Sequence, residues 1–204
     1  MKQQVIFINW AVPKENYDSY NHFLETREYD PFHESFRNWN KTLGEKLGEE
    51  YEYLRSPSSE VKFADYEAWK IMFEKMFPYF KDNIILATTS LGSTFILKYM
   101  GEKEFPVRIQ KLFFIAPAIA DTPEEKLWSF GFDLDLSYHR VNRWTDQIYI
   151  YHSRDDDLVP FEQGLELKSY FPEAIFREFD DKWHFFLESE LPEIVEDITE
   201  EKSL

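Results

Sequence analysis

Short runs of apolar residues, many of them β-branched or aromatic, alternate along the chain with longer segments whose apolar residues are three or four positions apart. The short runs are typical of buried strands, and the longer spacing is typical of one face of a helix. The runs predict six strands, at residues 5–9, 51–54, 83–88, 111–116, 147–152 and 174–179.

The intervening segments predict helices. Two helical faces are formed by Phe36, Trp39, Leu43 and Leu47, and by Tyr66, Trp69, Met72, Phe73, Met76 and Phe77. Further helices are expected at about 91–100, 160–170 and 192–200, and Pro160 suits the first turn of the second of these. Residues 121–146 are the least regular stretch, and we expect either a small cap or a surface loop with a few buried aromatic side chains.

Strands that alternate with helices predict βαβ units. We therefore expect an α/β fold, a three-layer α/β/α sandwich with a mostly parallel six-stranded sheet. The length of 204 residues suits a single domain, residues 1–204, with one sizeable core. Hydrophobic residues make up 43% of the chain, which argues against disorder.

Composition and charge disfavour several classes of protein. The chain has no cysteine, which excludes disulfides, thiolate nucleophiles and zinc–thiolate sites. It has no run of about 18 uncharged apolar residues and no signal-peptide cleavage site, so we expect a cytoplasmic protein with no membrane partner. The net charge of −16 repels phosphate backbones, so we expect no nucleic-acid partner. No pattern in the sequence indicates the oligomeric state.

Polar side chains follow three of the predicted strands. Ser90 follows the third strand, Asp155, Asp156 and Asp157 follow the fifth, and His184 follows the sixth. The carboxyl ends of parallel strands meet at one edge of a sheet, so these groups should lie close together. A serine hydroxyl is a weak nucleophile that needs a base, and histidine is a suitable base when a carboxylate orients it. The arrangement therefore favours acyl transfer.

Three motifs carry a resemblance to a known family. Residues 88–92 (TTSLG) resemble the G-x-S-x-G nucleophile elbow of α/β-hydrolases, with Thr88 in place of the first glycine. Residues 153–160 (SRDDDLVP) resemble the family segment G-x-x-D-x-x-V-P, whose offset selects Asp156, and residues 183–185 (WHF) are similar to G-H-F. The order Ser, Asp, His is also the order of this family.

The resemblance covers nearly the whole chain and is strongest to compact, lidless hydrolases of the retinoblastoma-binding serine hydrolase type. It implies a compact α/β-hydrolase fold and a serine hydrolase of the carboxylesterase kind, which cleaves a small ester, thioester or amide through an acyl-enzyme. It implies a small-molecule acyl substrate and neither cofactor nor metal. The residues it implies are a triad of Ser90, Asp156 and His184, and an oxyanion hole from the backbone N–H of Leu91 and of Trp10 or Ala11.

Structural explanations exist for each of these residues. Ser90 could cap the following helix, and the aspartates could be a solvated loop that complements a helix dipole, with Asp157 and Asp155 as the other triad candidates. A histidine among aromatic residues, as His184 is, could belong to the core, and His152 at the end of a strand is expected to be structural.

Two alternative functions stay open at the level of sequence. A metal site could gather oxygen and nitrogen ligands from Asp156, Asp180, Asp181, His152 and His184, although no compact metal-binding spacing is present. A non-catalytic binding module could keep the α/β-hydrolase fold without its chemistry. Thr88 in the elbow and Asn9-Trp10, where many relatives carry His-Gly, favour this second alternative.

Overall fold

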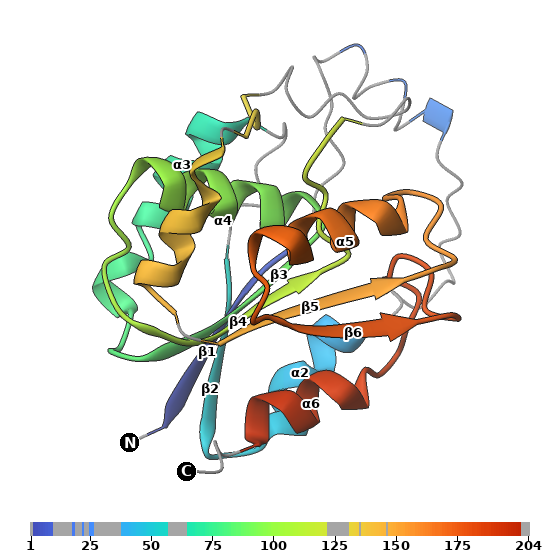
Figure 1. Cartoon of the computed structure of the whole chain (residues 1–204). Helices are drawn as coiled ribbons and strands as arrows, with labels where there is room; N and C mark the ends of the chain where they lie inside the picture. Colours follow the sequence, from blue (N-terminus) through green and yellow to red (C-terminus); the bar gives the residue numbers. More distant parts are fainter. Residues whose placement is uncertain are drawn as a thin grey trace.

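The computed structural model describes residues 2–9, 18, 22, 25–26, 38–56, 65–121, 131–134, 136–145 and 147–200. Within these residues, six parallel strands form one sheet in the order β2-β1-β3-β4-β5-β6 (Figure 1). The strands are β1 (Gln3–Ile8), β2 (Tyr51–Arg55), β3 (Ile84–Thr89), β4 (Ile109–Ile115), β5 (Ile148–Ser153) and β6 (Ile175–Phe179). The expected parallel sheet is therefore confirmed.

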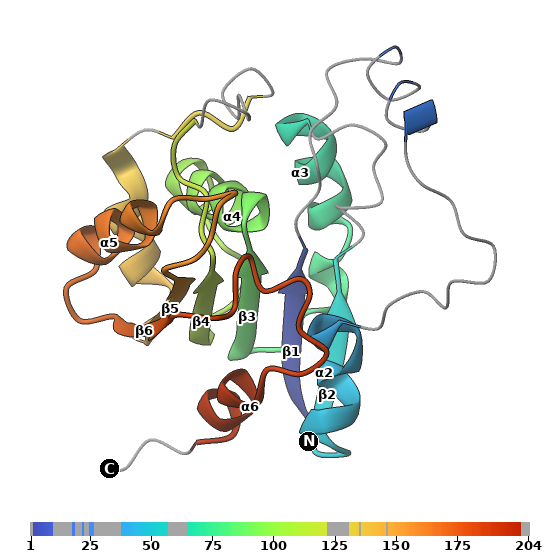
Figure 2. The same ribbon diagram turned by 90° about the vertical axis from the view of Figure 1, so that its right-hand side faces the viewer.

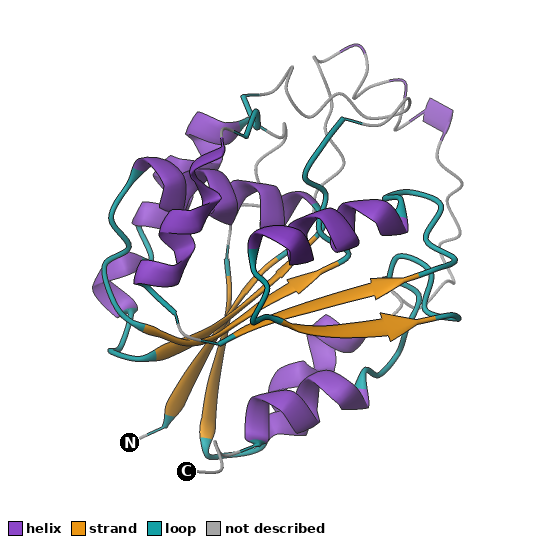
Figure 3. Cartoon of the chain, viewed as in Figure 1, coloured by secondary structure: helices purple, strands orange, loops and turns teal. Residues whose placement is uncertain are grey.

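Helices cover both faces of the sheet, as the three-layer prediction requires. The α-helices in the described ranges are α2 (Trp39–Leu47), α3 (Tyr66–Glu74), α4 (Leu91–Glu102), α5 (Phe161–Tyr170) and α6 (Pro192–Thr199), with 3₁₀ helices η2 (Phe77–Tyr79) and η4 (Leu136–Arg143). Figure 3 shows α3, α4 and α5 on one face and α2 and α6 on the other. The view turned by 90° in Figure 2 shows the same separation.

Strand residues alternate between the two faces of the sheet. In β3, Ile84 and Leu86 belong to the core under α3, α4 and α5, whereas Ile85 and Ala87 belong to the core over α2 and α6. Because both faces are buried, the strand reads in the sequence as a continuous apolar run rather than an alternating one. None of the helices in the described residues is long and apolar enough to cross a membrane.

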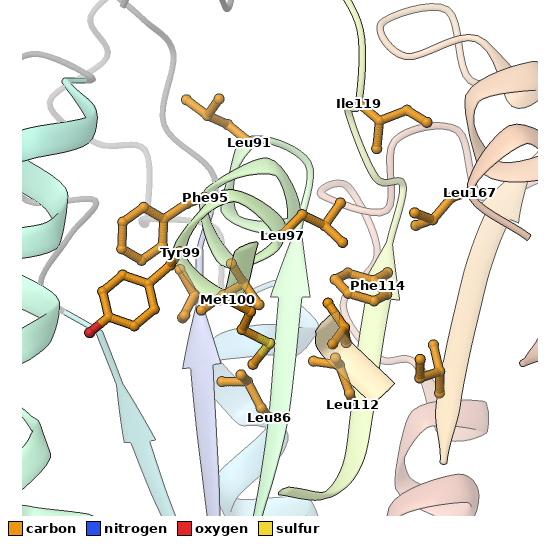
Figure 4. Close-up of a cluster of buried hydrophobic side chains, with 14 of the residues drawn as sticks. Leu86, Leu91, Phe95, Leu97, Tyr99, Met100, Leu112, Phe114, Ile119 and Leu167 are labelled. Atoms are coloured by element: carbon orange, nitrogen blue, oxygen red, sulfur yellow. The ribbon is translucent and has the colours of Figure 1, made fainter. Parts of the chain in front are cut away.

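Helix α4 is buried along nearly its whole length. Figure 4 shows its side chains, Phe95 and Met100 among them, over Leu86 of β3 and Phe114 of β4. The ring of Phe95 also meets Phe73 of α3 edge to face, with 5.3 Å between the ring centroids. This packing fixes the helix that begins directly after Ser90.

Helix α3 is shorter than its apolar periodicity predicts. The helix ends at Glu74, and Met76 and Phe77 lie at the start of η2 instead. The reason is Pro78, which has no N–H to donate to the carbonyl of Glu74 and whose ring would clash with that carbonyl. Both residues still pack against the core on the α3 side, as the pattern predicted.

The irregular region 121–146 is described in part, because residues 122–130, 135 and 146 lie outside the described ranges, so its role as a cap stays a prediction. In the described part, η4 packs against α4. The guanidinium of Arg140 donates a hydrogen bond of 2.7 Å to the carbonyl of Gly101, and Phe132 is fully buried against Trp69. Phe36 of the first predicted helical face also lies outside the described residues.

Candidate active site

Ser90 lies on a sharp turn between β3 and α4. Its backbone has φ 48° and ψ −121°, a left-handed conformation that costs a non-glycine residue energy and is concentrated at functional sites. The backbone N–H of Ser90 donates to the carbonyl of Ile115 in β4 at 3.0 Å. The side chain makes no capping hydrogen bond to α4. Helix capping therefore does not explain a serine at this position.

Gly92, the last residue of the elbow motif, stands where α4 meets the end of β1. A Cβ atom there would lie 2.7 Å from the carbonyl oxygen of Ile8 and 3.2 Å from that of Asn9. Real Cβ atoms do not approach backbone oxygens at the first of these distances, so the close packing requires glycine.

Thr88, which replaces the first glycine of the motif, is fully buried with its hydroxyl satisfied. Its Oγ1 donates to the carbonyl of Phe113 at 2.9 Å and lies 2.9 Å from the hydroxyl of Ser93. These two hydrogen bonds compensate for burying a polar group. The departure from the family motif is thus accommodated without disturbing the turn.

Asp156 and His184 are in direct contact at the carboxyl edge of the sheet. Asp156 Oδ2 lies 2.8 Å from His184 Nδ1, and both residues are buried. An ionised carboxylate can only accept, so Nδ1 carries the proton and Nε2 is left as the basic nitrogen of a neutral ring. The second oxygen, Oδ1, accepts the backbone N–H groups of Leu158 at 3.0 Å and Val159 at 2.9 Å.

These contacts determine the charge of Asp156. Burial by itself would raise its pKa, but hydrogen bonds from His152, His184 and the Val159 N–H, together with the positive charge that His184 carries when protonated, lower the pKa to about 2. Asp156 is therefore an anion at neutral pH, the state that orients an imidazole and stabilises its protonated form.

The other two aspartates hold the segment that carries His184. Asp155 Oδ1 accepts the hydroxyl of Ser153 at 2.5 Å and the backbone N–H of Trp183 at 2.9 Å, and Asp157 accepts the indole N–H of Trp183. On either side of His184, Trp183 and Phe185 have left-handed backbones, with φ 43° and 61°. The segment is thus held in a strained shape by hydrogen bonds from the neighbouring loop.

The structure describes only part of the predicted oxyanion hole. Leu91 is the first residue of α4, and N–H groups in a first helical turn have no acceptor within the helix. Trp10 and Ala11 lie outside the described residues. No hydrogen bond joins the described side chains of Ser90 and His184; such bonds are often long before a substrate binds.

Some features of the site were not foreseen from the sequence. His152, expected to be structural, approaches the same oxygen of Asp156 as His184 does, with Nε2 3.4 Å from Oδ2. Asp180 and Asp181, considered as metal ligands, are exposed, and no described group of three or more His, Asp or Glu side chains could hold a metal ion. No sequence motif marks the role of His152.

Comparison with known proteins finds similarity in structure only. No family model matches the chain, and no curated protein matches its sequence. The ydeN gene product from B. subtilis superposes with a TM-score of 0.73 at 16% identity, over 97% of each chain. The esterase domain of a Rhodothermus marinus protein gives 0.60 at 14% identity, over 92% of this chain and 80% of that one. A third similar structure is MGS-MChE2, an α/β hydrolase enzyme from the metagenome of sediments from the lagoon of Mar Chica, Morocco. It superposes with a TM-score of 0.56 at 15% identity, over 97% of this chain and 89% of that one.

Likeness at such low sequence identity concerns the fold. The narrower resemblance to hydrolases of the retinoblastoma-binding type stays a prediction. The parallel sheet, the strained turn after β3 and the neighbours in structure agree that this chain has the α/β-hydrolase fold.

Proposed function

We propose that the protein is a serine hydrolase that cleaves a small ester, thioester or amide through an acyl-enzyme. Ser90 is the nucleophile, His184 the general base and acid, and Asp156 the carboxylate that orients His184. The proposal depends above all on the 2.8 Å contact between Asp156 and His184 at the sheet edge where Ser90 occupies a strained turn. The names of two structural neighbours, an esterase domain and an α/β hydrolase enzyme, favour the same chemistry.

The reaction proceeds in two halves. Ser90 Oγ attacks the carbonyl carbon while its proton passes to His184 Nε2, and the resulting oxyanion is stabilised by backbone N–H groups of Leu91 and of Trp10 or Ala11. The intermediate collapses, and the leaving group takes the proton from His184. Water then attacks the acyl-serine by the same route and releases the acid. Throughout, the anionic Asp156 stabilises the imidazolium.

A fluorophosphonate probe tests the nucleophile. Wild-type protein should form one covalent adduct, and peptide mass spectrometry should place it on Ser90. Ser90→Ala should form none, and His184→Ala should react far more slowly because the hydroxyl loses its base. Ser169→Ala is the matched control, since Ser169 is exposed on α5 and its hydroxyl donates to the helix carbonyl of Glu166 at 2.7 Å. It should react as fast as wild type.

The opposite results have clear meanings. Equal labelling of Ser90→Ala would refute the assignment of the nucleophile. A folded wild-type protein that forms no adduct and hydrolyses no ester would favour the binding module that keeps the fold without the chemistry. Activity abolished by a chelator and restored by a divalent metal would favour the metal site instead.

A further inference from the structure

His152 lies at the end of β5, fully buried behind the carboxylate of Asp156. Its Nε2 is 2.9 Å from the carbonyl oxygen of Val159 and 3.4 Å from Asp156 Oδ2. A carbonyl oxygen can only accept, so Nε2 carries the proton and donates it to Val159, with Asp156 Oδ2 beside the same N–H. Because Oδ2 also accepts from His184, one carboxylate oxygen lies between two imidazole rings.

The ring of His152 packs against helix α5. It packs edge to face on Phe161, with 5.6 Å between centroids. It also faces Gly164, on the same helix α5 as Phe161, where a Cβ atom would lie 2.4 Å from Nδ1 and 3.0 Å from Cγ. The glycine therefore leaves the space that the ring fills. Glycine weakens a helix interior, so this space has a cost in helix stability.

Packing alone does not account for a histidine at this position. Nδ1 is buried and has no hydrogen-bond partner among the described residues. An unpaired buried nitrogen is unfavourable, and a phenylalanine ring would fill the space without it. The advantage of histidine must therefore lie at Nε2, which donates to the Val159 carbonyl and lies 3.4 Å from Asp156 Oδ2.

We propose that His152 is a positioning residue for the hydrolytic reaction proposed above, on which the inference rests: its Nε2–H holds Asp156 in the orientation that faces His184. The backbone N–H groups of Leu158 and Val159 fix one carboxylate oxygen, and the Nε2–H of His152 lies 3.4 Å from the other. By donating also to the Val159 carbonyl, His152 holds the loop that carries Asp156. It touches no substrate, since its side chain is fully buried.

Two substitutions separate the donor from the ring. His152→Gln places an amide nitrogen where Nε2 stands and keeps the donor, whereas His152→Phe keeps the ring and loses the donor. For a p-nitrophenyl ester, His152→Phe should lower kcat about 10- to 100-fold, the usual effect of losing an outer hydrogen-bond partner, with little change in KM. His152→Gln should restore most of kcat. Equal losses in both variants would overturn the proposal, because the ring and not the donor would then matter.

A second measurement does not depend on activity. The Nδ1 proton of His184 should give a far-downfield NMR resonance, assigned as the signal that His184→Ala abolishes. His152→Phe should shift or abolish this resonance, and His152→Gln should keep it. An unchanged resonance in folded His152→Phe would overturn the proposal, whatever its kcat. If wild type fails to react with the fluorophosphonate, the proposed function falls, but this comparison still decides whether His152 positions Asp156.

Discussion

Three consecutive aspartates after β5 carry the same charge and differ in the groups that their carboxylates contact. Asp156 accepts from the imidazole of His184, whereas Asp155 and Asp157 accept from the backbone and the indole of Trp183. The family motif selected Asp156 by its offset from Val-Pro. The partners of the other two were not predictable, because Trp183 reaches them from a segment that follows β6.

Exchanging single aspartates for asparagine should separate these roles. Asp156→Asn can offer its amide N–H₂ to His184 and favour the wrong tautomer, so kcat should fall by about 10³- to 10⁴-fold. Asp155→Asn keeps an oxygen that accepts from Ser153 and Trp183, so its kcat should stay within about tenfold of wild type. The kcat of ester hydrolysis, measured on both variants, tests this difference. Losses of kcat of similar size would show that Asp155 and Asp156 do not have separate roles.

The low pKa of Asp156 also makes folding stability depend on pH. Although burial opposes the shift, hydrogen bonds from His152 and His184 lower the pKa from its ordinary value of 3.8 to about 2. The unfolded chain therefore takes up this proton first as the pH falls. The contribution, about 2 kcal/mol, is complete above pH ~5 and is lost as the pH falls through about 2.

Urea unfolding of wild type and Asp156→Asn at several pH values isolates this contribution from the other carboxylates. The difference in unfolding free energy between the two proteins should narrow by about 1 kcal/mol between pH 6 and pH 3. A difference that stays constant over this range would show that Asp156 has an ordinary pKa in the folded protein.

At the scale of elements, two of the glycines that allow helices to approach their neighbours, Gly92 and Gly164, differ in what they face. A Cβ at Gly92 of α4 would meet the backbone oxygens of Ile8, the last residue of β1, and of Asn9, which follows it. A Cβ at Gly164 of α5 would meet the ring of His152. A side chain can change its rotamer, but a carbonyl in the sheet cannot move without breaking hydrogen bonds between the strands. Adding a side chain should therefore disturb the β1–α4 contact at Gly92 more than the contact at Gly164.

Alanine substitutions should reveal this difference. Gly92→Ala should destabilise the protein by about 1–3 kcal/mol and slow the reaction of Ser90 with fluorophosphonate, because α4 must shift away from β1. Gly164→Ala should destabilise less, because its Cβ meets a side chain that can shift and not a carbonyl of the sheet, but it should still lower kcat by displacing His152. Denaturant midpoints measure the change in stability, and labelling rates measure the reactivity of Ser90. A Gly92→Ala variant as stable and as reactive as wild type would contradict the close approach of α4 to β1.

Elements were predictable where burial dictates the pattern. The six predicted strands match the strands in the described residues to within about two residues at each end, since a strand buried on both faces is a continuous apolar run. The end of α3 was not predictable from periodicity. The helix ends at Glu74, ahead of Pro78, but Met76 and Phe77 still pack on the core as residues of a helical face would.

At the scale of the whole molecule, the topology of the sheet brought distant residues together as expected. Ser90, Asp156 and His184 follow β3, β5 and β6, whose carboxyl ends lie on one edge of a parallel sheet. The approach of His152 to Asp156 was not predictable in this way. It depends on the space that a glycine in α5 leaves beneath the ring, which is a property of packing rather than of strand order.

The net charge of −16 bears on which esters the proposed hydrolase would accept. A few residues before His184, Asp180 and Asp181 are exposed; they lie 3.8 Å from Arg154 and 3.7 Å from Lys182, and their two charges offset those cations. An anionic substrate should be repelled on approach, and salt should weaken the repulsion because the Debye length falls from ~30 Å at 0.01 M to ~8 Å at 0.15 M.

A matched pair of substrates tests this field. The acetate and the hemisuccinate of one neutral alcohol present the same leaving group and differ in the charge of the acyl part. At low salt, kcat/KM should be lower for the hemisuccinate and should rise several-fold between 0.01 and 0.15 M salt, whereas the acetate should change little. Asp180→Asn combined with Asp181→Asn should reduce the salt dependence of the hemisuccinate alone. If kcat/KM for the hemisuccinate falls as salt is added, the pocket itself presents positive charge to the acyl group, and the acidity of the surface would then serve solubility only.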